Sequence, residues 1–370
     1  MSTPTGSLGG PHDEGRSAMR DIASTRGVVL CCGSGGVGKT TTAAAIALEA
    51  AALGRSAVVV TIDPAKRLAD ALGIGELSNT ATLIEGDWPG ELWALMLDTE
   101  RTFNGLVARY AGSAEQAEKI LANTFYRNIA GALSGTQEYM ATEKLYELHA
   151  GGAFDLIVVD TPPSRHALDF LDAPGRLTRF LNHPLYRLVT APTRGVVRAV
   201  NVAAQPVLRG IAKAVGGEVI ADALAFFTAF DGMEEGFKER AAQVERLIAD
   251  PGTAFVLVAS PRSDTVTEAV FFAERLQSRG LTVAAVVVNR LFPLFDDLQD
   301  RKAIELDPAM AGRLTNYDQL RAIATGERAE IAPLISAVGD GEPIEVPLLP
   351  FEVTDLESLA DLGRFLFDPR

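Results

Sequence analysis

The chain has 370 residues, of which 47% are hydrophobic and 22% charged, and 48 acidic side chains against 34 Lys and Arg give a formal net charge of −14. This profile fits one large α/β domain or two modest ones, and it excludes a disordered or fibrous chain. An acidic chain repels a phosphate backbone, so we expect no nucleic-acid partner.

The N-terminal stretch 1–22 is rich in Gly, Ser, Pro and Thr and has no apolar period, so we expect a flexible tail. It lacks the basic-then-apolar order of a secretory signal. No apolar run in the chain is long enough to cross a bilayer. We therefore expect a soluble cytoplasmic protein, with peripheral contact to a membrane as an open alternative.

From residue 23 onward, short apolar segments alternate with segments of helical period. We expect strands at 27–32, 57–62, 92–97, 154–159, 253–259 and 281–288, and helices at 40–53 and 265–279. Strands that are apolar throughout and alternate with helices predict a mostly parallel sheet covered by helices on both faces. We interpret 23–370 as a single domain with helical insertions at about 99–150 and 165–250.

The only cysteines, Cys31 and Cys32, are adjacent in the first expected strand. Neighbouring residues of a strand point to opposite faces, so a disulfide between them is not expected. We expect both to be small buried hydrophobic residues in a reducing compartment.

A Gly-rich turn between the first strand and the first helix, residues 33–40, fits the phosphate-loop pattern G-x-x-x-x-G-K-[ST]. Glycines let successive N–H groups face a phosphate, and the helix N-terminus adds about half a positive charge. Lys39 is expected to bridge the β- and γ-phosphates, and Thr40 to ligate Mg²⁺. The nucleotide-binding candidates are Gly35, Gly36, Val37, Gly38, Lys39, Thr40 and Thr41. The fold class is thus α/β of the P-loop NTPase type.

Two carboxylates follow neighbouring expected strands. Asp160 ends the strand FDLIVVD, where a Walker B Asp holds Mg²⁺, and Asp63 ends the strand AVVVTID. Both fall at the carboxyl ends of strands, which is the ligand edge of such a sheet.

Five stretches, spread over roughly 27–360, resemble the ATPases of the arsenite pump and of tail-anchored membrane-protein targeting. The loop GSGGVGKT followed by TTAA is similar to that family's deviant Walker A sequence. The other four are similar to its switch I, its switch II, its adenine site and its P-L-L-P-x-E-V loop. They are, in order, 61–70, 160–168, 287–290 and 347–353.

The resemblance implies ATP, ADP and Mg²⁺ as ligands and assigns roles to individual residues. Asp63 would orient the attacking water and act with Lys39 in catalysis, while Asp160 would join Thr40 in serving Mg²⁺. Asn289 would hydrogen-bond adenine, and Pro350 and Phe351 would pack on the base. His166 falls on the family's switch II histidine and would either report the γ-phosphate or simply cap or pack.

The chain departs from the family pattern in three places. Ser34 stands where the family has a Lys that reaches a dimer partner's phosphates, so slow ATP turnover without a partner is expected. No C-x-x-C follows Asn289, so no structural zinc is expected. Arsenite sensing needs several separated thiols, which two adjacent cysteines do not provide.

The stretch 173–217 contains no Asp or Glu but seven basic side chains, and the apolar residues around it extend the candidate client surface to 173–235. Three interpretations stay open: packing against the body, a nucleotide-controlled groove for an apolar helix or membrane-protein client, or a basic surface for anionic lipid or an acidic partner.

We therefore expect an ATP-hydrolysing dimeric switch that serves as a chaperone or targeting ATPase for a protein client. It would be a homodimer or, as we favour, a heterodimer whose paralogous subunit donates the missing Lys. The alternatives are a nucleotide-binding scaffold subunit with little activity of its own and a transport-associated ATPase for anions or metalloids.

Overall fold

The computed structural model describes residues 12–63, 67–124, 136–182, 222, 225–226, 228–230, 232–295, 308–339 and 341–368. Within them, eight strands form one sheet in the order β3-β4-β2-β5-β1-β6-β7-β8. The pairs are parallel except that β3 runs antiparallel to β4. The strands are β1 Val28–Cys32, β2 Ser56–Thr61, β3 Thr82–Ile84, β4 Glu91–Met96, β5 Leu156–Asp160, β6 Thr253–Ala259, β7 Val283–Leu291 and β8 Ile344–Pro347. The predicted α/β class with a mostly parallel sheet is confirmed.

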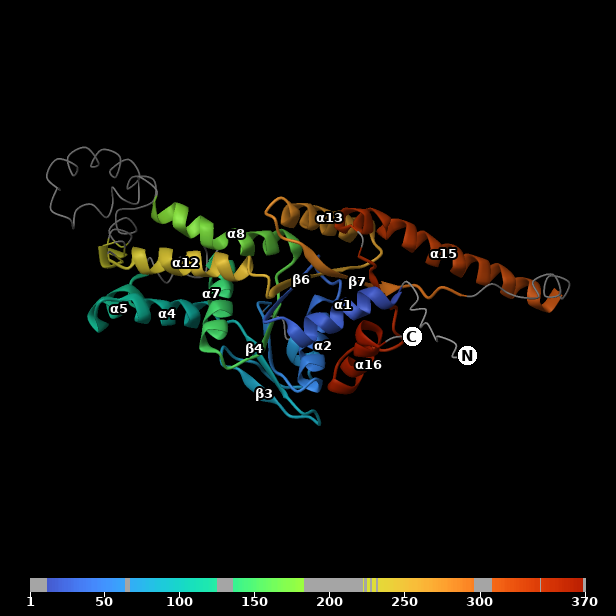
Figure 1. The fold of residues 1–370 in the computed structure, drawn as a ribbon, viewed down its shortest axis with the longest axis horizontal. Coiled ribbons are helices and arrows are strands. Elements are labelled where there is room, and N and C mark those ends of the chain that lie inside the picture. The colour runs from blue at the N-terminus through green and yellow to red at the C-terminus, as the bar shows by residue number, and fades with distance from the viewer. Residues whose placement is uncertain are drawn as a thin grey trace, which may run out of the picture.

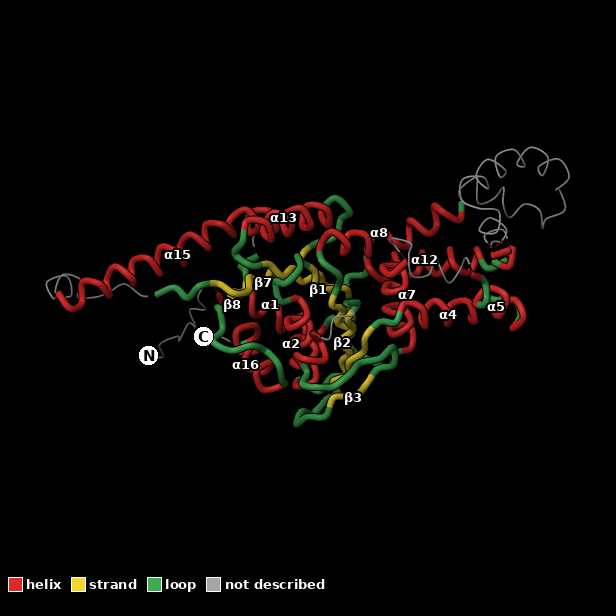
Figure 2. The backbone as a smooth tube through the Cα atoms, turned by 180° about the vertical axis from the view of Figure 1, so that it is seen from behind, coloured by secondary structure: helices red, strands yellow, loops and turns green. Residues whose placement is uncertain are grey.

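Helices cover both faces of the sheet, as Figures 1 and 2 show from opposite sides. The core on one face includes residues of α1, α2 and α16, and the core on the other includes residues of α4, α7, α8, α12, α13 and α15. The helices are α1 His12–Thr25, α2 Lys39–Ala52, α3 Arg67–Ala71, α4 Thr99–Tyr110, α5 Ala114–Leu121, α7 Thr136–Gly151, α8 Ser164–Leu181, α12 Glu234–Ile248, α13 Ser263–Gln277, α15 Pro308–Val338 and α16 Leu356–Phe367.

The strands are apolar throughout because alternate residues enter different cores. In β1, Cys31 packs into the core that holds α2, and Cys32 packs into the core that holds α13. Both thiols are free, and both are at most 2% exposed. Burial raises the pKa of the Cys32 thiol to about 12. The two cysteines are therefore the small buried residues that the sequence predicts.

Residues 12–22 are helical, which corrects the expectation that they belong to a flexible tail. They form most of α1, whose side chains Met19, Ile22 and Ala23 are buried against the α2 and α16 side of the sheet. These residues recur at the spacing of one helical face. Because polar residues surround them, the composition of the segment is polar and does not indicate this apolar face. The other residues of the expected tail, 1–11, lie outside the described part of the chain.

The described residues place helices in both of the ranges expected for insertions, 99–150 and 165–250. α4, α5 and α7 lie between β4 and β5, and α8 and α12 lie between β5 and β6. In Figure 1 α4, α5 and α12 extend to the left of the sheet, and α15 extends to the right. None of the helices in the described ranges has the length and apolar character needed to span a membrane.

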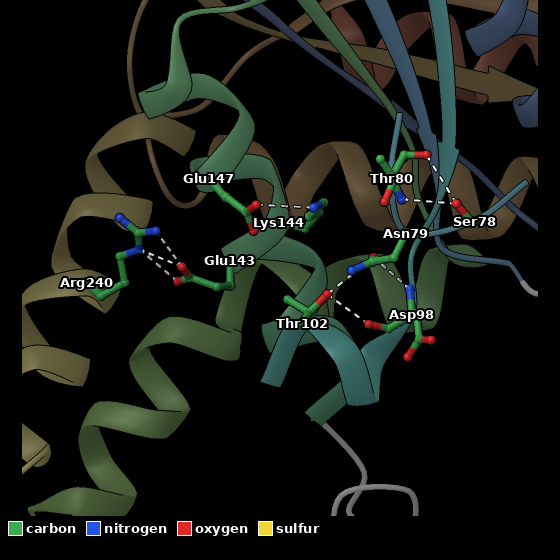
Figure 3. Close-up of polar contacts among 9 residues, drawn as sticks. All are labelled: Ser78, Asn79, Thr80, Asp98, Thr102, Glu143, Lys144, Glu147 and Arg240. Carbon is green, nitrogen blue, oxygen red and sulfur yellow. Dashed lines mark hydrogen bonds and ion pairs between the residues drawn. The ribbon is translucent and has the colours of Figure 1, made fainter. Parts of the chain in front are cut away.

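A buried ion pair joins the two insertions. Arg240 of α12 donates from Nε to Glu143 Oε1 of α7 at 2.7 Å and from Nη2 to the same oxygen at 2.5 Å (Figure 3). The Glu143 side chain is 2% exposed and that of Arg240 is 8% exposed. Separating the two helices would leave each buried charge without its partner, so the ion pair holds α7 against α12.

Candidate functional site

The phosphate loop connects β1 to α2, as the sequence predicts. Gly38 is the N-cap of α2 and has a left-handed φ of 102°, which favours glycine. At Gly33 an added Cβ would lie 2.0 Å from the Val258 carbonyl oxygen, so the loop packs too tightly on β6 for a side chain there. Glycines in such a loop allow the curvature that a phosphate-binding turn before a helix needs.

Lys39 opens α2 and lies inside the loop. Its Nζ donates to the Ser34 carbonyl oxygen at 2.8 Å, and the residue is 7% exposed. Burial lowers the pKa of Lys39, while nearby Asp160 acts against that shift. Within the described part of the chain the Ser34 carbonyl is the acceptor for this ammonium, which has three N–H donors, so others can serve phosphate oxygens.

Asp160 lies beside both the loop and β2. It pairs in register with Cys31 of β1 and with Thr61 of β2. Its Oδ2 accepts from Thr40 Oγ1 at 2.7 Å and from Thr61 Oγ1 at 3.0 Å. Its Oδ1 is buried and has no hydrogen-bond partner among the described residues. Burial raises the pKa of Asp160, and the Thr40 hydroxyl opposes this.

The donor set around Asp160 fits Mg²⁺. A hydroxyl oxygen and a carboxylate lie together, and one carboxylate oxygen is buried without a partner. Mg²⁺ prefers such oxygen ligands and binds beside phosphates through one or two carboxylates. For zinc, the described residues contain no cluster of three His, Cys, Asp or Glu that would hold a metal, and the absence of zinc stays a prediction.

Asp63 follows β2 and faces the same space. Its Oδ2 lies 3.8 Å from Nη1 of Arg67, and its backbone N–H donates to Thr61 Oγ1 at 3.3 Å. The carbonyl oxygen of the preceding residue, Ile62, accepts a hydrogen bond of 3.2 Å from Nε2 of Gln137 in α7. The first turn of α7 is thus attached to the main chain next to Asp63.

Asn289 packs directly on the phosphate loop. Its Nδ2 donates to the Val37 carbonyl oxygen at 2.9 Å, and an added Cβ at Gly38 would lie 2.2 Å from the same nitrogen. The next residue, Arg290, has a φ of 66°, the one left-handed non-glycine conformation in the described ranges. The pairing of β7 with β8 shifts register at this point. The bulge lets two successive residues border the same cavity.

One cavity of about 870 Å³ gathers these groups at the carboxyl edge of the sheet. Its volume lies in the range of small-molecule pockets. Of the predicted site residues it is lined by Gly35, Gly36, Gly38, Lys39, Thr40, Thr41, Asp63, Asp160, Asn289, Pro350 and Phe351. Val37 is the exception, because its side chain is buried in the core under the loop and only its carbonyl meets Asn289.

Three residues at the site have no individual role predicted from the sequence, although two of them, Arg67 and Arg290, belong to the motif stretches 61–70 and 287–290. Arg67 and Arg290 line the cavity, and Glu268 of α13 accepts a hydrogen bond of 2.7 Å from Ser34 Oγ. Arg67 was accessible to prediction, because it follows Asp63 by four residues, a spacing at which opposite charges meet. Glu268 is 234 residues from Ser34 and gives no such signal.

Some sequence predictions fall on residues that the structure leaves undescribed. The side chain of His166 is one, and most of the basic stretch 173–217 and of the client surface 173–235 is another. Residues 64–66 of the switch I motif also lie outside the described ranges.

The chain is similar to several ATPases over most of its length. It is 24% identical to the ATPase GET3 of Malassezia globosa over 341 residues, 92% of this chain and 91% of the relative. It is 27% identical to the ATPase get3 of Sclerotinia sclerotiorum over 343 residues, 91% and 88% of the two chains. It is 28% identical to the ATPase ASNA1 homolog of Cryptosporidium parvum over 267 residues, 71% and 64% of the two chains.

The glycine loop on β6, the lysine inside it and the carboxylate beside Thr40 lie together at one edge of the sheet. The sequence of the chain matches one protein family over residues 26–368, which includes all of these residues. The chain belongs to the anion-transporting ATPase family.

Proposed function

We propose that the protein binds and hydrolyses ATP and works as a nucleotide-controlled switch for a protein client. The observation that carries the proposal is the convergence of Lys39, Thr40, Asp63 and Asp160 on one cavity. Membership of an ATPase family and the relatives named ATPase GET3 support hydrolysis rather than binding alone.

The phosphates of ATP would lie in the loop, with Lys39 countering their charge. Thr40 and Asp160 would hold Mg²⁺, which when bound neutralises phosphate oxygens. Asn289 and the loop that carries Pro350 and Phe351 would bind the base. Phe351 is 40% exposed and Leu348 is 53% exposed, so this loop offers apolar surface at the rim of the cavity.

Asp63 would accept a hydrogen bond from water and aim it at the γ-phosphorus. The water oxygen forms a new bond to phosphorus, the bond to the β–γ bridging oxygen breaks, and the proton leaves with the phosphate product. The products are ADP and phosphate. Positioning and charge stabilisation account for most of the catalysis of such a reaction.

The identity of residue 34 is relevant to the oligomeric state. A neutral hydroxyl supplies no charge to a partner's phosphates, and the Ser34 side chain is directed at Glu268 within its own chain. We infer that the protein acts as a dimer, and that a paralogous subunit with Lys at this position donates the missing charge. Hydrolysis by the chain alone would then be slow.

The resemblance to tail-anchor targeting ATPases supports a client that is an apolar helix or a membrane protein, bound through 173–235. A scaffold subunit with little activity is the second candidate, and Ser34 is the observation that favours it. A transport-associated role for anions or metalloids is the third, which the family's description favours.

The test measures binding and hydrolysis separately on the full chain. Titration with ATP and Mg²⁺ in a calorimeter should show binding that Lys39→Ala abolishes. The wild type should release phosphate faster than Asp63→Asn, which keeps the shape of the site but accepts a hydrogen bond from water less well. If the wild type binds ATP but releases phosphate no faster than Asp63→Asn, the result favours the scaffold subunit over the ATPase. If the wild type does not bind ATP, both the ATPase and the scaffold function are refuted.

The client and partner are tested by purifying the chain from its own host with ADP and with a non-hydrolysable ATP analogue. A paralogous ATPase or a membrane protein that co-elutes in only one nucleotide state would support the switch. Hydrolysis that proceeds at an unchanged rate when the co-eluting subunit is added would contradict a charge-donating partner.

A further inference from the structure

The phosphate end of the cavity is short of positive charge. Asp63 and Asp160 both line it, whereas Lys39 is the only cation that the phosphate loop supplies. Ser34 is neutral and adds no positive charge. ATP brings further negative charge, so a second protein cation beside its phosphates would stabilise the bound nucleotide together with Mg²⁺.

Arg67 is placed to supply that charge. It opens α3, four residues beyond Asp63, and lines the same cavity. Its Nη1 lies 3.8 Å from Asp63 Oδ2, and its side chain is 61% exposed. An exposed pair at this separation is weak, so the guanidinium is not committed to Asp63.

The charge of Arg67 also acts on Lys39. Burial is the main cause of the lowered pKa of Lys39, and the positive charge of Arg67 contributes to the same shift. Both cations line the same cavity. A phosphate group between them would relieve their repulsion.

We propose that Arg67 is a phosphate-binding residue, whose guanidinium contacts the γ-phosphate of bound ATP and at the same time orients the Asp63 carboxylate. The proposal rests on the proposed ATPase function and names a residue of this chain that acts at its γ-phosphate site. A guanidinium has five donors in a planar fork, so one edge meets Asp63 while another meets phosphate oxygens. The charge comes from the same chain and supports basal hydrolysis without a partner's lysine.

The experiment compares two nucleotides in the full-length chain, because only one of them has a γ-phosphate. Dissociation constants for ADP and for ATPγS, each with Mg²⁺, are measured for the wild type, Arg67→Ala and Arg67→Lys. We expect Arg67→Ala to weaken ATPγS binding by about tenfold or more and ADP binding by less than about twofold. Arg67→Lys restores part of the lost affinity, since it keeps the charge but not the fork.

Arg101→Ala is the matched control. Arg101 is an exposed arginine that pairs with Asp98 at the start of α4, with an Nε–Oδ2 distance of 3.4 Å, and it lines no part of the cavity. The Arg101→Ala variant should bind ADP and ATPγS with the same affinities as the wild type. Thermal unfolding of each variant checks that the fold is retained.

Equal weakening of ADP and ATPγS by Arg67→Ala, or no weakening, would overturn the role of Arg67 while leaving the ATPase function intact. Failure of the wild type to bind either nucleotide would instead overturn the proposed function, and this proposal with it. A second readout is single-turnover hydrolysis, which Arg67→Ala should slow more than Arg101→Ala does.

Discussion

Ser34 donates a hydrogen bond from Oγ to Oε2 of Glu268 at 2.7 Å, although 234 residues separate the two. The same residue accepts the Lys39 ammonium on its carbonyl oxygen at 2.8 Å. The main chain of residue 34 therefore serves Lys39, and its side chain anchors the loop to α13. A substitution at this position removes the side-chain contact with Glu268 and keeps the main-chain contact with Lys39, because every residue has the carbonyl group.

Ser34→Lys tests whether the missing cross-subunit charge limits the rate. We expect faster ATP hydrolysis by the chain alone, with a rate per chain that rises with protein concentration as dimers form. The control Ser34→Ala loses the hydrogen bond to Glu268 without gaining a charge, which costs about 1 kcal/mol of unfolding free energy. Steady-state phosphate release over a range of protein concentrations is the measurement. A rate of Ser34→Lys equal to that of Ser34→Ala would contradict the prediction.

Thr40→Val should remove the benefit of Mg²⁺. The two side chains have nearly the same shape, but valine offers no oxygen to a metal and no hydrogen bond to Asp160 Oδ2. Calorimetry with ATP is carried out with Mg²⁺ and with EDTA. In the wild type Mg²⁺ should tighten ATP binding. In Thr40→Val the ATP dissociation constants measured with Mg²⁺ and with EDTA should converge. Thr267→Val, an exposed threonine of α13 that bonds only to the Ser263 carbonyl among the described residues, serves as the control.

Asn289→Asp should loosen the phosphate loop. The substitution exchanges the donor that meets the Val37 carbonyl oxygen at 2.9 Å for a carboxylate oxygen that repels it. We expect the free energy of unfolding to fall by about 1–3 kcal/mol and ATP affinity to fall with it. Urea unfolding and nucleotide titration measure the two effects. Unchanged stability would show that the amide has no structural part in shaping the loop.

The buried pair Glu143 and Arg240 predicts a non-additive double variant. Either Glu143→Met or Arg240→Met leaves one charge buried without its partner, and each should lower the free energy of unfolding by about 3–5 kcal/mol. The double variant replaces both charges with apolar side chains and should recover most of that loss. Urea unfolding of the four proteins gives the coupling energy directly, and losses that simply add would exclude a coupled pair.

Asp355 gives a prediction of pH dependence. It caps α16, and hydrogen bonds from the Ser358 hydroxyl and backbone N–H lower its pKa below the ordinary value of 3.8. A carboxyl with a lowered folded-state pKa adds stability above 3.8 and loses it as the pH falls through the folded-state value. Asp355→Asn keeps a capping oxygen without the charge. Wild type should melt at a higher temperature than the variant at pH 7, and this difference should disappear at low pH.

The sequence was informative where a local pattern had a single physical interpretation. A buried strand, a glycine loop and an Ala-rich helix predict the geometry around Lys39, and the apolar strands ending at Asp63 and Asp160 predict one edge of the sheet. Short edge strands gave no such signal, and β3 and β8 were missed. So was α15, 31 residues long, whose pattern includes Pro333.

Contacts between distant residues were not predictable in the same way. Nothing in the residue order pairs Ser34 with Glu268 or Gln137 with Ile62, because these contacts depend on how α13 and α7 pack on the sheet. The buried face of α1 was hidden for a different reason, since its few apolar residues stand among polar ones.

α7 is held at two points that belong to different parts of the molecule. Gln137 in its first turn is bonded to the main chain beside Asp63, and Glu143 is clamped to α12. These anchors are six positions apart, about 9 Å along the axis at a rise of ~1.5 Å per residue. A helix segment this short behaves as a stiff rod. A displacement of the Ile62 carbonyl would therefore move α7 as a unit and change its contact with α12.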